Sequence, residues 1–165
     1  MVTNWILAFR PKTLTAAVVP ILVGSALVYF QTGSLVWWVS LCALFSSLSI
    51  QVATNLLNDA IDFEKGADTH ERIGPKRVSQ SGLISSRTVM RVGFLFLLLA
   101  VVFGVPLVLR GGAPIVAIGL VSIFLAYSYT GGFFPLAYLG LGDIFVILFF
   151  GFIAVMGLNY LLVLE

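Results

Sequence analysis

Two aspartates and an asparagine follow a helical spacing in the residues that lead up to Gly66. Asn55, Asp59 and Asp62 stand at positions i, i+4 and i+7, and Gly66 stands at i+11. This spacing predicts that the three polar side chains share one face of a helix that continues through residue 62 and ends at Gly66. Two carboxylates so close together need a positive charge between them, and Mg²⁺ is a hard cation that binds oxygen ligands and substrate phosphates. The pattern therefore favours a Mg²⁺ site at Asp59 and Asp62.

Basic residues follow the aspartates directly in the sequence: Lys65, Arg72, Lys76 and Arg77. A metal bridges phosphate oxygens, and arginine donates forked hydrogen bonds to the oxygens that remain. Carboxylates with a metal on one side and basic residues on the other are therefore typical of a site that binds a diphosphate. The alternative is a solvated loop whose charges only set the membrane topology.

The remainder of the chain has the composition of a membrane protein. Of its 165 residues, 60% are hydrophobic and 10% are charged, whereas a soluble domain carries about 25% charged residues. This composition excludes a disordered chain and a typical soluble domain. The single cysteine excludes a disulfide scaffold, and the net charge of +2 gives no indication of nucleic-acid binding.

Charge-free stretches long enough to cross a bilayer predict the elements that position the polar loop. We expect an all-α fold, a multi-pass transmembrane helical bundle in a single membrane domain, 1–165, with a catalytic loop at about 63–87. The expected helices cover residues 13–30, 35–62, 88–109, 114–129 and 143–163. Eight of the nine Lys and Arg residues fall on one side of this topology and only Arg110 on the other. Because basic residues are enriched in cytoplasmic loops, the N-terminus and the Asp-rich loop are expected to be cytoplasmic, in the inner membrane.

Several runs of sequence, taken together, resemble the UbiA family of membrane prenyltransferases. The run 55–69, NLLNDAIDFEKGADT, resembles the first aspartate-rich motif of that family. The run 71–85, ERIGPKRVSQSGLIS, is similar to the branch that prenylates 1,4-dihydroxy-2-naphthoate. RPKTL at 10–14, PILVGS at 20–25, YTGG at 129–132 and GLGD at 140–143 agree with the same branch.

The resemblance implies an enzyme that transfers a polyprenyl group from an allylic polyprenyl diphosphate to 1,4-dihydroxy-2-naphthoate, with Mg²⁺. The products would be demethylmenaquinone, CO₂ and diphosphate. Asp59 and Asp62 would be the catalytic, metal-holding residues, with Asn55 assisting. The substrate-binding residues would be Arg10, Asn55, Lys65, Arg72, Lys76, Arg77, Tyr127 and Tyr129.

The sequence departs from this family in its length. The family has about nine membrane helices and a second aspartate-rich motif, whereas only about five helices are expected here. Beyond the Asp-rich loop the only acidic residues are Asp143 and Glu165. The chain would then be a portion of a full enzyme, would pair with a second chain that supplies the missing half, or would be an inactive remnant. A non-catalytic membrane subunit is the rival function.

Overall fold

The chain folds into a bundle of helices. The computed structural model describes residues 2–67, 77–133 and 135–164, and no strand occurs within these ranges. The expected all-α helical class is therefore confirmed. The elements in chain order are α1 (Val2–Phe9), α2 (Pro11–Thr32), α3 (Trp37–Glu64), α4 (Ser86–Gly111), α5 (Ala113–Ser128), α6 (Gly142–Val146), the π-helical segment η1 (Ile147–Ile153) and α7 (Ala154–Val163).

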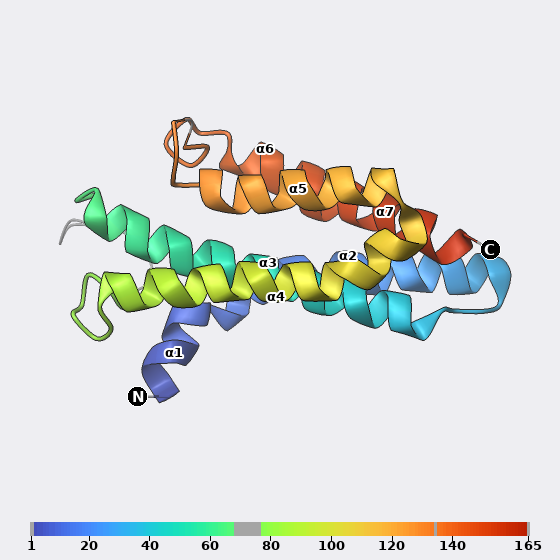
Figure 1. The fold of residues 1–165 in the computed structure, drawn as a ribbon, viewed down its shortest axis with the longest axis horizontal. Coiled ribbons are helices and arrows are strands. Elements are labelled where there is room, and N and C mark those ends of the chain that lie inside the picture. The colour runs from blue at the N-terminus through green and yellow to red at the C-terminus, as the bar shows by residue number, and fades with distance from the viewer. Residues whose placement is uncertain (1, 68–76, 134, 165) are drawn as a thin grey trace.

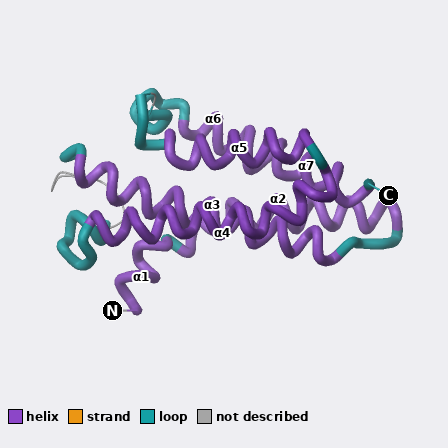
Figure 2. The backbone as a smooth tube through the Cα atoms, in the orientation of Figure 1, coloured by secondary structure: helices purple, strands orange, loops and turns teal. Residues whose placement is uncertain are grey.

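The long helices run back and forth along the longest axis of the molecule (Figure 1). α2 leads away from the N-terminal end, α3 returns, α4 leads away again and lies along α3, and α5 returns. The continuous helical stretch of α6, η1 and α7 then runs in the same direction as α2 and α4 and ends near the C-terminus. The loop after α3 and the loop after α5 therefore lie at the same end of the bundle, as the loop colouring in Figure 2 shows.

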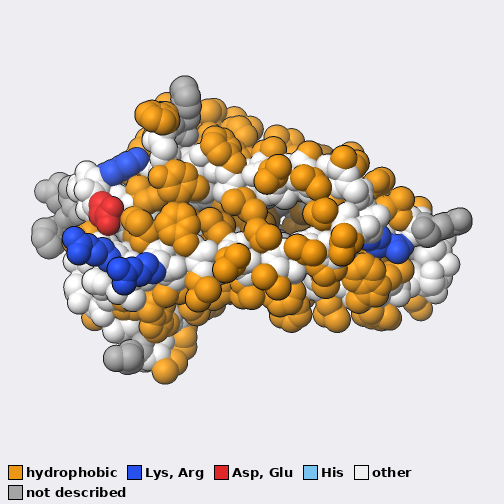
Figure 3. All heavy atoms as spheres, viewed as in Figure 1, with side chains coloured by type: hydrophobic (Ala, Val, Ile, Leu, Met, Phe, Trp, Pro, Cys, Tyr) orange, Lys and Arg blue, Asp and Glu red, His pale blue; other side chains and the backbone are white. Residues whose placement is uncertain are grey.

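Among the described residues, four helical stretches are long and apolar enough to cross a membrane: Pro11–Thr32, Trp37–Glu64, Ser86–Gly111 and Gly142–Val163. The fifth apolar helix, α5, has 16 residues and spans about 24 Å at 1.5 Å per residue, somewhat less than a bilayer core. Hydrophobic side chains cover the middle of the bundle in Figure 3. Most of the visible Lys, Arg and acidic side chains gather at the end that carries the loops after α3 and α5, called the loop-bearing end below, and basic side-chain atoms also appear at the opposite end. The chain is thus a multi-pass integral membrane protein.

Two features of the fold were not expected from the sequence. The first is the short helix α1, which precedes the first membrane span and packs against α3. The second is η1, which divides the last span into α6, a π-helical segment and α7. Arg10 connects α1 to α2 with a φ of 51°, a left-handed backbone that side-chain-bearing residues rarely adopt. Such strain is a common feature of functional positions.

The end of α3 positions the polar residues. The helix continues to Glu64, so it includes Asn55, Asp59 and Asp62 as the spacing predicted. Gly66 then adopts a φ of +66°, a left-handed backbone that glycine tolerates without penalty. The amide of Ala67 donates to the carbonyl of Asp62 at 3.0 Å, which completes the helix terminus.

Candidate functional site

Asp59 is the most buried carboxylate of the candidate site. It is only 1% exposed, and its two oxygens each accept one backbone hydrogen bond of 3.0 Å, from the amides of Val78 and Ser79. Val78 is fully buried in an apolar cluster with residues of α3 and α4, so its side chain holds this part of the loop against both helices. Asp59 therefore fixes the part of the α3–α4 loop that directly follows Arg77.

Asp62 and Arg77 form a buried ion pair. Arg77 Nη2 lies 2.5 Å from Asp62 Oδ2, and both side chains are less than a tenth exposed. Arg77 Nη1 donates a second hydrogen bond, of 2.6 Å, to the carbonyl of Asn58. A buried charge is tolerated when an opposite charge and hydrogen bonds compensate it. The guanidinium is thus held against the same turn of α3 that carries both aspartates.

The loop after α5 reaches the same end of α3. The hydroxyl of Thr130 donates to Asn58 Oδ1 at 2.8 Å, and Lys65 Nζ donates to the carbonyl of Thr130 at 2.6 Å. The phenol of Tyr138 donates a short hydrogen bond to Asp62 Oδ1. The ammonium of Lys65 also lies 5.2 Å from the centre of the Tyr138 ring, within the range of a cation–π contact. Two loops far apart in sequence therefore meet at Asp62.

Asn55 lies one turn before Asp59 and faces the junction of α1 and α2. Its amide nitrogen donates to the carbonyl of Phe9 at 2.9 Å and to the hydroxyl of Thr13 at 2.8 Å. These contacts leave the carbonyl oxygen of the side chain as the atom through which Asn55 could assist a metal. They also tie α3 to the backbone next to Arg10.

Tyr127 and Tyr129 lie near the end of α5. Tyr127 is 40% exposed, and Tyr129 lies just after the helix and is partly buried. A side chain at Gly142 would place its Cβ 2.8 Å from the phenol oxygen of Tyr129, so the Tyr129 ring would have to shift. Burial raises the pKa of Tyr129 above its ordinary 10.0, and the charge of Asp143 raises it further. The charge of Arg10 lowers it and that of Asp62 raises it.

The raised pKa of Tyr129 predicts a specific pH dependence of stability. Near pH 10 the unfolded chain releases the phenol proton while the folded chain keeps it, so the stabilisation is present below pH 10.0 and is lost as the pH rises further. Relative to the Tyr129→Phe variant, the unchanged protein should lose thermal stability above that pH and show no such relative loss below it. Thermal unfolding of both proteins in detergent measures this difference. A constant difference across the whole range would contradict the assignment.

The structure thus brings together six of the residues predicted from the sequence. Asp59, Asp62 and Arg77 form one cluster, Lys65 lies beside it, and the charge of Arg10 acts on Tyr129 together with that of Asp62. Arg72 and Lys76 lie outside the described residues. Lys65, predicted to bind substrate, contacts the loop after α5 in this structure.

Sequence reasoning missed four polar residues that lie around the aspartates: Asn58, Ser79, Thr130 and Tyr138. Ser79 and Thr130 are both less than a tenth exposed, and the hydroxyl of Ser79 has no hydrogen-bond partner in the part of the chain that the structure describes. The available signal was weak. Tyr138 is a phenol in a stretch without charged residues, and it lies 76 positions from its partner Asp62.

The donor set at the end of α3 suits a hard divalent cation. Asp59 and Asp62 contribute four carboxylate oxygens, and each oxygen has one protein hydrogen bond or ion-pair contact described above. A carboxylate oxygen offers about two lone pairs, so each retains capacity for a further ligand. Within the described ranges, no third carboxylate, histidine or cysteine joins them to form a metal-binding group. Two carboxylates that leave positions for waters and phosphates are typical of Mg²⁺ sites.

A comparison with known proteins identifies the class to which this fold and site belong. Residues 17–162 match the UbiA prenyltransferase family, so the chain is a member of that family. It is 39% identical over 163 residues to the 1,4-dihydroxy-2-naphthoate octaprenyltransferase of Escherichia coli, covering 95% of this chain and 53% of that protein. It is 34% identical over 157 residues to the protein of the same name from Mycobacterium tuberculosis, with the same two coverages.

A third relative has a different name. The 2-carboxy-1,4-naphthoquinone phytyltransferase of Synechocystis is 35% identical over 158 residues, covering 94% of this chain and 50% of that protein. The chain therefore spans about half the length of the curated relatives it matches. The predicted resemblance to the UbiA family is confirmed.

Proposed function

We propose that this chain provides the diphosphate-binding part of an aromatic prenyltransferase site. The reaction would transfer a polyprenyl group from an allylic polyprenyl diphosphate to 1,4-dihydroxy-2-naphthoate, with loss of CO₂ and diphosphate, and give demethylmenaquinone in its hydroquinone form. The observation that carries the proposal is the buried cluster of Asp59, Asp62 and Arg77 at the end of a membrane helix. The names of the relatives support a naphthoate acceptor and an isoprenoid donor.

We further propose that the divalent cation is Mg²⁺, held by Asp59 and Asp62, with the side-chain oxygen of Asn55 as an additional donor. When bound, the cation would neutralise charge that develops on the departing diphosphate. The hard-oxygen donor set supports this choice over softer metals.

The protein residues have distinct roles in the proposed reaction. Arg77 exchanges its contact with Asp62 for the diphosphate, and the planar fork of its guanidinium can donate to two non-bridging phosphate oxygens at once. As the allylic C–O bond breaks, its electron pair goes to the diphosphate, and Arg77 stabilises that charge where it forms. The apolar parts of the helices next to the site exclude water from the electron-poor allylic carbon until the acceptor ring attacks it.

We propose that the N-terminus and the loops carrying the site face the cytoplasm, in the inner membrane. The basic residues at the loop-bearing end support this orientation, because such residues are enriched on the cytoplasmic side. Arg110 lies at the opposite end of α4, where it donates to the carbonyl of Leu161 at 2.8 Å and so ties α4 to α7.

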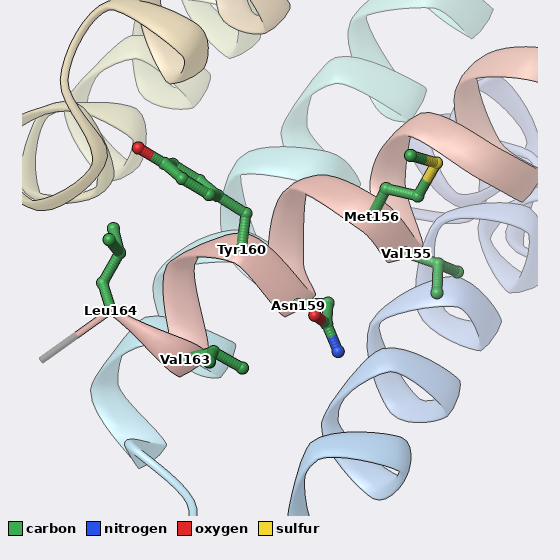
Figure 4. Close-up of a pocket in the computed structure, with 6 residues that line it drawn as sticks. All are labelled: Val155, Met156, Asn159, Tyr160, Val163 and Leu164. Carbon is green, nitrogen blue, oxygen red and sulfur yellow. The ribbon is translucent and has the colours of Figure 1, made fainter.

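A second membrane segment that completes the site is the proposed partner. The last span, Gly142–Val163, is the least buried of the four. Only 17% of its apolar stretch is buried inside the bundle, compared with 39% for α3. α7 and Leu164 line a groove of about 580 Å³ (Figure 4). The groove includes the side-chain amide of Asn159. A polar side chain within a membrane span favours a helix that offers it a hydrogen bond.

Product formation tests this proposal. The chain is produced in a bacterium that lacks its own naphthoate prenyltransferase, alone and together with the part of the E. coli relative that it does not cover. Membranes in which the two pieces copurify receive farnesyl diphosphate, 1,4-dihydroxy-2-naphthoate and Mg²⁺, and mass spectrometry detects the prenylated product. We expect product that disappears with EDTA. Copurifying pieces that form no product would instead favour a non-catalytic membrane subunit or an inactive remnant.

A further inference from the structure

We infer that Tyr138, on the loop after α5, is a positioning residue for the carboxylate of Asp62. This inference rests on the proposed function and adds a residue that the sequence did not indicate. Asp62 is 5% exposed and is held at both oxygens, by Arg77 at Oδ2 and by the phenol of Tyr138 at Oδ1. The two contacts come from different loops, so they can be released independently.

The loop that carries Tyr138 is fixed to α5 and to α3. The amides of Leu136 and Ala137 donate to the carbonyls of Ser128 and Tyr129 at 3.1 and 2.9 Å, so the chain folds back onto the end of α5. The same residues form a turn that begins at Pro135, in which the amide of Tyr138 donates to the Pro135 carbonyl at 3.1 Å. The position of the phenol is therefore set by backbone contacts as well as by Asp62.

The two partners of Asp62 differ in what they can do next. Arg77 carries a positive charge that a diphosphate attracts, so ligand binding draws the guanidinium away from Oδ2. Tyr138 is neutral and has no such reason to leave, and its ring also contacts Lys65. Tyr138 thus keeps Oδ1 in place while Oδ2 becomes available. Hydrogen bonds to metal-binding carboxylates orient them, and their loss typically costs about 10–100-fold in metal affinity.

The test measures Mn²⁺ binding to the full chain in lipid nanodiscs, with farnesyl diphosphate present, by the electron paramagnetic resonance signal of free Mn²⁺. Tyr138→Phe removes the phenol oxygen and keeps the ring. We expect it to weaken Mn²⁺ binding about 10-fold or more. Tyr160→Phe is the matched control, because it removes a tyrosine hydrogen bond of 3.1 Å to the Gly111 carbonyl at the opposite end of the bundle. Its Mn²⁺ affinity should equal that of the unchanged chain.

Two further variants separate the possible outcomes. Thr130→Val removes the contact between this loop and Asn58 but leaves the hydrogen bond to Asp62. If Thr130→Val weakens Mn²⁺ binding as much as Tyr138→Phe does, Tyr138 only tethers the loop and the inference is overturned. It is also overturned if Tyr138→Phe binds Mn²⁺ normally while Asp62→Asn does not. If Asp62→Asn binds Mn²⁺ normally, the proposed metal site itself is wrong.

Discussion

Replacing Asp62 with Asn is expected to weaken metal-dependent binding of an allylic diphosphate by about 100-fold or more. Loss of a residue that only orients a ligand costs about 10–100-fold, and loss of the ligand itself should cost at least as much. The amide also loses the charge that pairs with Arg77 and offers one acceptor oxygen in place of two. Titration of nanodisc-embedded protein with farnesyl diphosphate and Mg²⁺ measures the change.

Asp59→Asn should cause a loss of the same size by a second route. Both carboxylate oxygens of Asp59 accept backbone hydrogen bonds, from Val78 and Ser79. An Asn side chain can accept only one of these and directs N–H groups at the other amide, so the segment that carries Arg77 should shift.

Glu64→Gln is the matched control for both aspartate variants. It makes the same carboxylate-to-amide change on the same helix end, at an exposed residue that accepts one hydrogen bond of 3.3 Å from the Ser86 hydroxyl. Diphosphate binding should be unchanged in this variant. Equal losses in Glu64→Gln and in the aspartate variants would show that any charge change at this end suffices, which contradicts a specific site.

Replacing Arg77 with Met is expected to impair both stability and diphosphate binding. Removing one partner of a buried ion pair leaves the other charge uncompensated and typically costs about 3–5 kcal/mol. Arg77 also satisfies the carbonyl of Asn58, so the loss extends to the backbone of α3. Denaturant or thermal unfolding in detergent measures the stability, and the farnesyl diphosphate titration measures the binding.

A double variant distinguishes the two effects of Arg77. Arg77→Met combined with Asp62→Asn removes both charges, so it should recover most of the lost free energy of unfolding while diphosphate binding stays lost. Arg77→Lys should retain more stability than Arg77→Met but bind diphosphate poorly, because it lacks the forked donors. If Arg77→Met unfolded at the same temperature as the unchanged protein, the buried ion pair would not contribute as described.

Much of the fold could be predicted because the physical signals are local. The charge-free stretches predict membrane helices, and the spacing of Asn55, Asp59 and Asp62 predicts that α3 extends past the apolar region. Gly66 marks the end of that helix in the sequence and in the structure. The short helix α1 was missed because it precedes the first charge-free stretch. The π-helical segment η1 was missed because ILFFGFI is apolar throughout and carries no signal for a change of helical period.

The candidate site was only partly predictable. The aspartates and Arg77 stand close together in sequence, so their types and spacing indicate a common role. The contacts of Asp62 with Tyr138 and of Asn58 with Thr130 join residues more than 70 positions apart. No local pattern specifies such pairs, because they depend on how α5 returns to the loop-bearing end of the bundle. The contribution of the loop after α5 to the site therefore depends on the three-dimensional arrangement of the helices.

A metal-dependent diphosphate site at the end of α3 is tested most directly by calorimetric titration of the nanodisc-embedded chain with farnesyl diphosphate, once with Mg²⁺ and once with EDTA. We expect saturable binding with Mg²⁺ that is lost with EDTA and in the Asp59→Asn and Asp62→Asn variants. Equal affinity with and without Mg²⁺, or unchanged affinity in both variants, would contradict a diphosphate site at the end of α3.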